Sequence, residues 1–264
     1  MNILDKIVAQ KKIEVANNKE LYPTQLLEKS TFFNGKTVSL SQYIKREDKT
    51  GIIAEFKRRS PSKPSINLYA NVEEVSISYM QAGASALSVL TDKTFFGGSS
   101  EDLTTARKFN FCPILRKDFI IDEYQVIEAR SIGADAILLI AEILTKEEVK
   151  SLSNLAHSLG LEVLLELHSE TQLDKYNSDI KNIGVNNRDL DTFKTDIQFS
   201  KDLFDKLPSA VTKVSESGIH SAAVVNALKE VGYDGFLIGE RFMVNANPGE
   251  ACKSFIQDIK SIAT

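Results

Sequence analysis

The sequence contains few of the side chains that build metal and redox sites. It has two cysteines, Cys112 and Cys252, and three histidines that lie far apart in the chain. No cysteine or carboxylate stands at metal-ligand spacing around these histidines, so we expect no zinc site. Both cysteines sit among apolar neighbours, which favours reduced, structural thiols in a cytoplasmic protein, with a disulfide between them as the alternative.

Long apolar runs and an excess of one charge are also missing. No stretch approaches 18 uncharged apolar residues, and Asp5 and Lys6 interrupt the apolar N-terminus too early for a signal peptide. Lys and Arg number 32 against 36 Asp and Glu, which gives a net charge of −4. Nothing therefore draws the whole molecule to nucleic acid or to a membrane. We expect a cytosolic protein whose anion sites, if it has any, are local.

The pattern of apolar residues in the first part of the chain differs from that in the rest. Residues 1–47 predict amphipathic helix, with an apolar run that begins at Ile3 and includes Ile7, Ile13 and Val15. We expect an N-terminal helical extension that packs on a catalytic barrel of residues 48–264, the two forming one structural domain. The simplest role for such an extension is that of a brace with no chemistry of its own.

After residue 50, one pattern recurs: a helix, a glycine, usually one or two small or acidic residues, and a short apolar strand. The glycines are Gly83, Gly133, Gly160 and Gly232, at separations of 50, 27 and 72 residues. These are close to two, one and three units of about 25 residues, the length of a strand-helix unit in a barrel. Glycine at the end of a helix adopts the left-handed cap conformation at little steric cost.

Filling the gaps in this pattern gives eight strands that alternate with helices. They are Ile52–Lys57, Ala86–Leu90, Pro113–Lys117, Ala136–Ile140, Leu161–Leu167, Asn182–Asn186, Val211–Ser215 and Gly235–Gly239. Such alternation implies parallel strands joined by right-handed crossovers, and this length fits an α/β protein of the closed (β/α)8, or TIM, barrel type. A doubly wound open sheet is the alternative, but the first strand lacks the G-x-G-x-x-G turn of dinucleotide folds.

Polar side chains cluster where the strands end, which is the face that carries the chemistry in such barrels. Period two puts Glu55 and Lys57 on one face of the first strand, Lys117 on the same face as Leu115, and Glu166 on the same face as His168. The full strand-end set is Glu55, Lys57, Thr91, Asp92, Lys117, Glu142, Glu166, His168, Asn186, Arg188, Ser215, Glu216, Ser217, Gly239 and Glu240. Any one of these could simply close the barrel in an ion pair. Together they exceed what stability requires, because burying many charges is costly.

Lys117 and Glu166 form a plausible acid and base facing one substrate, with Glu55 and Lys57 as a second pair. In a partly dry pocket or beside another cation the pKa of a lysine falls, and that of a glutamate rises in similar surroundings, so both would become usable near neutrality. Schiff-base chemistry by Lys117 or Lys57 is the alternative on these residues alone.

Two further groups of residues suggest ligand contacts. The loops after the seventh and eighth strands contain Gly218 and Gly239, and such loops often bind phosphate through backbone N–H groups, here with Ser60 from across the mouth. Phe96 and Phe119, with Pro61 and Leu190, could form an apolar slot for a flat ring. Packing against the helix layer is the alternative for the aromatic side chains.

These motifs, taken in order, resemble those of the indole-3-glycerol phosphate synthase family over the whole chain. The matching segments are Ile53–Lys63, Leu90–Ser99, Pro113–Phe119, Leu165–His168, Ile183–Leu190, Val214–Ile219 and Leu237–Glu240. Two departures stand out. Gly97 and Gly98 occupy positions where relatives often carry a longer polar side chain, and Pro64 replaces a frequent glycine, so we expect a looser second loop and a stiffer first loop.

The resemblance implies a carbon-carbon lyase of tryptophan biosynthesis. Its substrate would be 1-(2-carboxyphenylamino)-1-deoxyribulose 5-phosphate, which closes a ring and loses carbon dioxide and water to give indole-3-glycerol phosphate. It implies no cofactor and no metal. We expect a small phosphorylated molecule as the only partner, no nucleic acid or membrane, and a monomer or weak homo-oligomer.

The resemblance also implies roles for individual residues. Lys117 would be the general acid, Glu166 or Glu55 the base, and Lys57 would hold the substrate carboxylate or act as a second acid. Asn186 is placed with this catalytic set. The substrate-binding set is Ser60, Gly218, Gly239 and Glu240 for the phosphate, Glu216 and Ser217 for the sugar hydroxyls, Arg188 for polar atoms, and Pro61, Phe96, Phe119, Leu190 and Leu237 around the rest of the substrate.

Three other functions are consistent with a barrel of this kind. Phosphoribosylanthranilate isomerase needs a Cys and Asp pair at strand ends, and neither Cys112 nor Cys252 is placed for that. A Schiff-base aldolase would form a lysine adduct that borohydride traps. An inactive binding protein would have no need of both Lys117 and Glu166.

Overall fold

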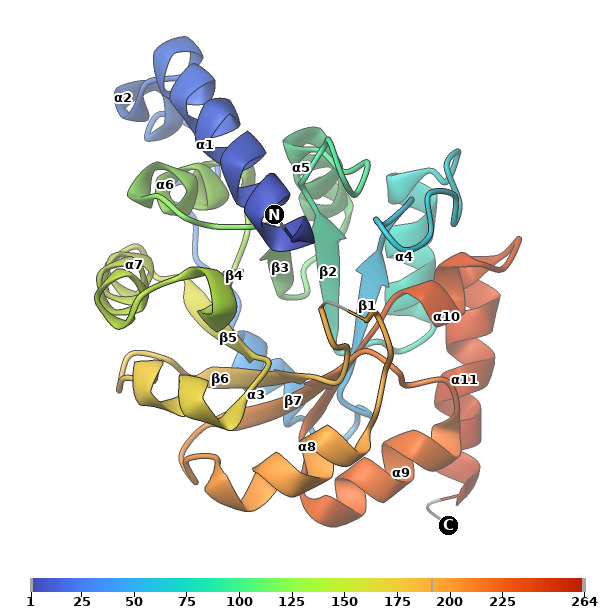
Figure 1. The fold of residues 1–264 in the computed structure, drawn as a ribbon. Coiled ribbons are helices and arrows are strands. Elements are labelled where there is room, and N and C mark those ends of the chain that lie inside the picture. Colours follow the sequence, from blue (N-terminus) through green and yellow to red (C-terminus); the bar gives the residue numbers. More distant parts are fainter. Residues whose placement is uncertain (1, 191, 263–264) are drawn as a thin grey trace.

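The computed structural model describes residues 2–190 and 192–262, and in it eight parallel strands close into a barrel. Each strand pairs with the next along the chain, and β8 pairs with β1 (Figure 1). The strands are β1 (Ile52–Phe56), β2 (Ala86–Leu90), β3 (Ile114–Lys117), β4 (Ala136–Ile140), β5 (Glu162–Leu167), β6 (Asn182–Asn186), β7 (Thr212–Glu216) and β8 (Gly235–Ile238). The predicted TIM barrel is confirmed, and each strand lies within about one residue of its expected range.

Helices cover the outside of the barrel, and most begin at a side chain that caps them. Asn71, Ser99, Asp122, Thr145 and Ser221 each accept a hydrogen bond from the first turn of a helix. The helices are α4 (Val72–Gln81), α5 (Ser100–Phe109), α6 (Glu123–Ile132), α7 (Lys146–Ser158), α8 (Gln198–Leu203), α9 (Ala222–Val231), α10 (Glu240–Met243) and α11 (Pro248–Ile262). Three 3-10 segments complete the layer: η1 (Ala141–Ile143), η2 (Glu170–Lys175) and η3 (Phe204–Lys206). After β5 the crossover is η2 rather than the α-helix that strict alternation predicts.

All four recurring glycines adopt the left-handed backbone predicted for them at helix ends, and Gly83 and Gly160 do so one residue beyond the caps of α4 and α7, with φ values of 100° and 76°. Gly133 and Gly232 cap α6 and α9 with φ values of 94° and 118°, in the left-handed region that other residues avoid. A Cβ atom on Gly232 would lie 2.4 Å from the ring of Phe204, so this turn also lacks space for a side chain.

The barrel strands have two apolar faces, as the period-two pattern of the first strand predicts. Ile53 belongs to a buried cluster inside the barrel, whereas Ile52, Ala54 and Phe56 belong to a larger cluster between the barrel and its helices. Glu55 therefore points inward with Ile53. The apolar inner cluster thus gives way to polar side chains such as Glu55 toward the carboxyl ends of the strands.

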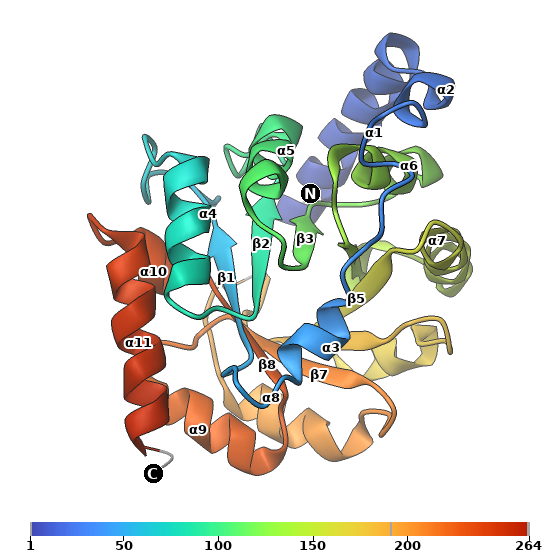
Figure 2. The same cartoon turned by 180° about the vertical axis from the view of Figure 1, so that it is seen from behind.

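The N-terminal segment contributes to both ends of the inner cluster. It forms α1 (Ile3–Leu21), α2 (Thr24–Leu27) and α3 (Leu40–Ile44). Leu4 and Ile7 of α1, and Leu40 and Ile44 of α3, are buried in the same cluster as the inward-facing strand residues. Figure 1 shows the start of α1 beside the ends of β2 and β3, and Figure 2 shows α3 near β7 and β8.

The helical reading of residues 1–47 is only partly right. Residues 28–39 form turns and extended chain, and Ile13, expected in the apolar run, is 58% exposed. The buried stripe of α1 consists of Leu4, Ile7, Lys11 and Val15, a spacing of three and four residues. A lysine thus occupies a core position of this helix.

The two thiols are buried and unpaired, and burial raises the pKa of both Cys112 and Cys252 to about 12. No helix in the described part of the chain is long and apolar enough to cross a membrane.

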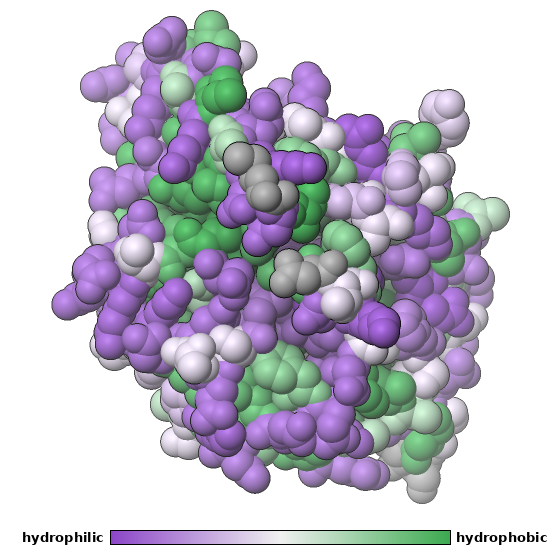
Figure 3. Space-filling model, in the orientation of Figure 1, coloured by the Kyte–Doolittle hydropathy of each residue, from purple (hydrophilic) through white to green (hydrophobic). Residues whose placement is uncertain are grey.

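Figure 3 shows hydrophobic surface beside the N-terminal part of α1, with hydrophilic residues around it. This surface adjoins the mouth of the barrel.

Candidate active site

One cavity opens at the carboxyl ends of the strands, and every residue of the predicted catalytic and substrate-binding sets lines it. Side chains from β1, β3, β5, β6 and β7 reach it because the ends of parallel strands meet at one face of the barrel. Ile3, Leu4 and Ile7 of α1 also line the cavity. The N-terminal extension is therefore part of the pocket wall, a contribution that the sequence analysis did not predict.

Lys117 lies at the centre of a group of carboxylates. Its Nζ is 2.9 Å from Glu166 Oε2 and 3.5 Å from Glu216 Oε2. Burial lowers the pKa of Lys117, but the nearby charges of Glu166, Glu216 and Glu55 outweigh that effect and hold the pKa well above its usual range. The expected lowering of this pKa is therefore wrong, because the neighbours of Lys117 are anions from three other strands.

Glu166 and Glu216 both contact Lys117, but their pKa values are shifted in opposite directions. Burial raises the pKa of Glu166, but Lys117 and His168 lower it to about 2, which corrects the expected increase. For Glu216, burial and the charge of Glu166 together exceed the effect of Lys117 and raise its pKa well above the usual value. The two shifts run in opposite directions, so Glu216 binds a proton more readily than Glu166 does.

Glycine makes room for both inward-pointing carboxylates. A Cβ on Gly184 of β6 would lie 2.1 Å from Glu216 Oε1, and one on Gly239 would lie 2.5 Å from Glu55 Oε1. Lys57 Nζ is 2.7 Å from Glu55 Oε1, so the predicted second pair is also in contact. Gly239 thus has a steric reason to be glycine, beyond the backbone approach for which it was predicted.

The rim of the cavity contains backbone in unusual conformations. Ser217 and Gly218 have φ values of 67° and 73°, both left-handed. Across the mouth, Ser60 Oγ is 3.2 Å from Ser62 Oγ, and Lys63 Nζ is 3.1 Å from Glu240 Oε1. Glu240 can therefore offer a ligand its backbone N–H, since its side chain is paired with a lysine.

Phe96 and Phe119 form an aromatic pair at the wall, with ring centroids 5.7 Å apart. The loop that carries Phe96 is held by Asp92, whose Oδ1 accepts hydrogen bonds from the backbone N–H groups of Phe95 and Phe96. A Cβ on Gly98 would lie 2.0 Å from the carbonyl oxygen of Leu90. The double glycine is thus required by close packing of this loop against the end of β2.

A second charged cluster lies behind this wall, around Lys11 of α1. Lys11 Nζ is 2.9 Å from Glu14 Oε1, 3.1 Å from Asp92 Oδ2 and 3.0 Å from Asp118 Oδ1. The Lys11 side chain is 1% exposed, and Asp92 and Asp118 are equally buried. This cluster pins α1 to the ends of β2 and β3.

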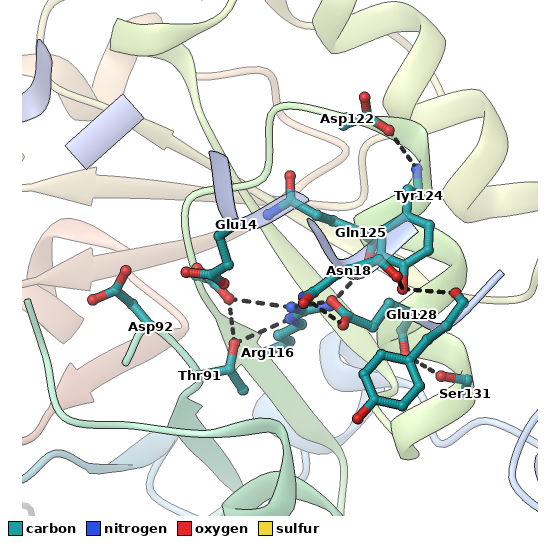
Figure 4. A network of polar contacts seen from close by, with 12 residues as sticks. Glu14, Asn18, Thr91, Asp92, Arg116, Asp122, Tyr124, Gln125, Glu128 and Ser131 are labelled. Carbon is teal, nitrogen blue, oxygen red and sulfur yellow. Dashed lines mark hydrogen bonds and ion pairs between the residues drawn. The ribbon is translucent and has the colours of Figure 1, made fainter. Parts of the chain in front are cut away.

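The cluster extends along α6. Arg116 Nη2 lies 3.2 Å from Asp118 Oδ2 and 2.6 Å from Glu128 Oε2, and Arg116 Nε donates to Thr91 Oγ1. Figure 4 shows Thr91, Arg116 and Glu128 next to one another, with Glu14 close by. Thr91 and Asp92, two of the predicted strand-end residues, thus belong to this structural cluster.

Glu142 also lies apart from the cavity. It stands in η1, where its Oε2 accepts a hydrogen bond from Gln172 Nε2 of η2. The prediction that it joins the strand-end chamber is wrong, because β4 turns directly into a 3-10 segment. Lys11 was missed, although its place in the stripe of Leu4, Ile7 and Val15 was a signal that the sequence contained.

Among the described residues, no group of three or more His, Cys, Asp or Glu side chains could hold a metal ion. In the cavity Lys117 lies between two carboxylates whose pKa values are shifted in opposite directions, which places a proton donor beside a proton acceptor. A closed β/α barrel with these groups at its strand ends defines an enzyme of the (β/α)8 class.

Comparison with known proteins identifies the family. The sequence profile of indole-3-glycerol phosphate synthase matches residues 4–255. The chain is 49% identical to the indole-3-glycerol phosphate synthase of Bacteroides thetaiotaomicron, over 98% of this chain and 99% of that protein. It is 43% identical to that of Campylobacter fetus subsp. fetus, over 91% and 94%. The chain belongs to the indole-3-glycerol phosphate synthase family.

Solved structures agree on the fold. Thiamine phosphate pyrophosphorylase from Pyrococcus furiosus superposes with a TM-score of 0.61 at 14% identity, over 82% of this chain and 98% of that one. At this identity the likeness concerns the fold alone.

Membership of the family establishes the activity. The protein is a carboxy-lyase of tryptophan biosynthesis and acts on a small phosphorylated substrate. The family is neither that of the isomerase nor that of a Schiff-base aldolase.

Proposed function

We propose that the cavity converts 1-(2-carboxyphenylamino)-1-deoxyribulose 5-phosphate to indole-3-glycerol phosphate, with Lys117 as the general acid. The observation that carries this is the position of Lys117 Nζ, 2.9 Å from Glu166 and 3.5 Å from Glu216. The raised pKa keeps the amine protonated at neutral pH, so it carries a proton when the substrate binds. Lys117 gives this proton to the ribulose carbonyl oxygen as the aromatic carbon attacks.

Glu166 is the base of the later dehydration. Its low pKa keeps it ionised, and its contact with Lys117 places a proton acceptor beside the donor. The raised pKa makes Glu216 the member of the pair that more readily carries a proton, with which it can donate a hydrogen bond to a sugar hydroxyl, whereas ionised Glu166 can only accept one. Three ionisable groups thereby take three distinct roles.

Lys57 binds the substrate carboxylate and is oriented by Glu55. The 2.7 Å contact between them supports this, because Glu55 is buried whereas Lys57 is only partly so. Asn186 and Arg188 hold polar atoms of the substrate. The Oδ1 atom of Asn186 accepts from the backbone N–H of Arg188, which ties the two together at the end of β6.

The phosphate lies against Ser60, Gly218, Gly239 and Glu240, with Ser217 beside it at the sugar hydroxyls. The anthranilate ring lies among Pro61, Phe96, Phe119 and Leu190, and Leu237 lines the same pocket. The left-handed backbone at Ser217 and Gly218 supports the first assignment, since it leaves N–H groups free to face an anion. The aromatic pair of Phe96 and Phe119 supports the second.

We further propose that residues 1–47 and 48–264 form one structural domain, and that one copy of the chain carries a complete site. The shared core of α1, α3 and the barrel supports this. Sedimentation at working enzyme concentration, with activity measured in parallel, tests it: activity that appears only in a dimer would contradict it.

The experiment that tests the reaction mixes the purified protein with the substrate, without added metal or cofactor, and follows indole absorbance and fluorescence. The chain has no tryptophan, so its own background is low. Indole formation with one equivalent of carbon dioxide is the expected result. A folded protein that binds the substrate without forming indole would contradict the proposal.

A further inference from the structure

His168 is the one strand-end histidine, and neither the catalytic nor the binding set uses it. It follows β5 directly, and its side chain is 7% exposed while lining the cavity. Neither ring nitrogen has a hydrogen-bond partner among the described residues. A buried imidazole with both nitrogens free is unusual, because buried polar groups are nearly always hydrogen-bonded.

The ring faces the carboxylate proposed as the base. His168 Nε2 lies 3.4 Å from Glu166 Oε1, whereas Lys117 Nζ contacts the other oxygen, Oε2. The carboxylate thus lies between two nitrogens, one on each oxygen. In unliganded sites such contacts are often long and shorten when substrate binds.

The backbone beneath His168 is fixed, so the ring cannot easily move away. The N–H groups of His168 and Ser169 both donate to Gln172 Oε1, at 2.7 and 3.3 Å. Gln172 is in turn bonded to Glu142 of η1. These bonds explain why Gln172, which does not line the cavity, is buried beside the site.

We propose that His168 is a positioning residue for Glu166, donating a hydrogen bond from Nε2–H to Oε1 during the reaction. Once Lys117 has given up its proton it is neutral, and its attraction for Glu166 weakens. His168 then keeps the carboxylate in the orientation that proton abstraction requires. The inference rests on the proposed role of Glu166 as the base.

The titratable groups around this carboxylate are Lys117 from β3, Glu216 from β7 and His168 itself, with Glu55 of β1 facing Lys117 from the far side. A loss of the imidazole removes one of the two groups that stabilise ionised Glu166. The acid limb of the kcat against pH profile should therefore move to higher pH in His168→Leu.

The test compares His168→Leu and His168→Gln with His157→Gln, a change at an exposed histidine of α7. We expect His168→Leu to lower kcat by about 10- to 100-fold, the usual effect of losing a group that orients a ligand or base, with little change in KM. His168→Gln, which keeps a donor near Nε2, restores most of kcat and the wild-type acid limb. His157→Gln is unchanged.

Equal losses in the Leu and Gln variants, or a wild-type kcat in His168→Leu, would overturn the inference. A double-mutant cycle distinguishes the positioning role of His168 from the proposed role of Glu166 as the base. If Glu166→Gln abolishes turnover, His168→Leu added to it should cost nothing more, whereas a further loss of the residual rate would show that His168 acts elsewhere. If Glu166→Gln keeps full activity, the proposed base itself is wrong.

Discussion

Lys117 and Asp118 are consecutive in the chain, yet their charges belong to separate clusters on opposite sides of the barrel wall. The ammonium of Lys117 lies 2.9 Å from Glu166 in the cavity, whereas the carboxylate of Asp118 lies 3.0 Å from Lys11 of α1. A single peptide therefore joins the proposed acid to the cluster that holds the N-terminal helix. Changes on one side should be detectable on the other.

Lys117→Ala should lower kcat by at least about 100-fold, the lower range for the loss of acid–base catalysis. Initial rates of indole formation measure this directly. Lys150→Ala, at an exposed position on α7, is the control and should keep the wild-type rate. A near-normal kcat in Lys117→Ala would mean that another group protonates the carbonyl.

Lys11→Met should lower the free energy of unfolding by about 3–5 kcal/mol, because it leaves Asp92 and Asp118 as buried charges without their cation. Denaturant unfolding measures the change, and Lys12→Met, the exposed neighbour, should alter it little. We also expect a lower kcat in Lys11→Met at temperatures where it remains folded, since Asp92 holds the backbone of Phe96. Equal stability of the two variants would contradict a structural role for Lys11.

Acid should destabilise the protein partly through Asp118. Burial alone would raise the pKa of this group, but Lys11 and Arg116 lower it to about 2, below the unfolded value of about 3.9. Its contribution, of the order of 2 kcal/mol, is complete above pH 4 and disappears as the pH falls toward 2. Unfolding midpoints between pH 2 and 5 should rise less steeply in Asp118→Asn than in the wild type. Parallel curves would show that Asp118 does not titrate in this range.

Gly218→Val should raise KM by at least about tenfold with a smaller change in kcat, because it disturbs binding more than chemistry. The residue has a φ of 73°, and its Cβ would lie 3.1 Å from Thr195 Cβ, so a branched side chain must displace the loop. Steady-state kinetics, with the affinity for inorganic phosphate as a second readout, check this. Unchanged values of both KM and phosphate affinity would remove Gly218 from the phosphate site.

The barrel could be predicted from the sequence because its signals are local. Apolar strands follow helix-ending glycines such as Gly133, and period two sets which side of a strand faces the interior. The convergence of Lys117 and Glu166 follows from the same rule, since the ends of parallel strands share one face. No contact between distant residues had to be guessed.

The predictions that were wrong concern properties that depend on distances between residues of different strands. The pKa directions of Lys117 and Glu166 were predicted with the wrong sign because they follow from which charges lie nearest, and Glu216 supplies the proton-holding partner. Lys11 was missed because its partners lie some 80 residues and more further along the chain. Glu142 was misplaced because the 3-10 turn after β4 carries no clear sequence signal.

The two ends of the barrel interior are closed by one short stretch of chain, through Leu4 and Ile7 at the mouth and Leu40 and Ile44 at the opposite end. On the ribosome this stretch emerges before any strand of the barrel, yet Leu237 of β8, which belongs to the same buried cluster, is added only when nearly the whole chain has been made. Its apolar side chains must stay unburied throughout that time. The segment that completes the active site is thus among the first parts of the chain to be made and among the last whose native contacts can all form.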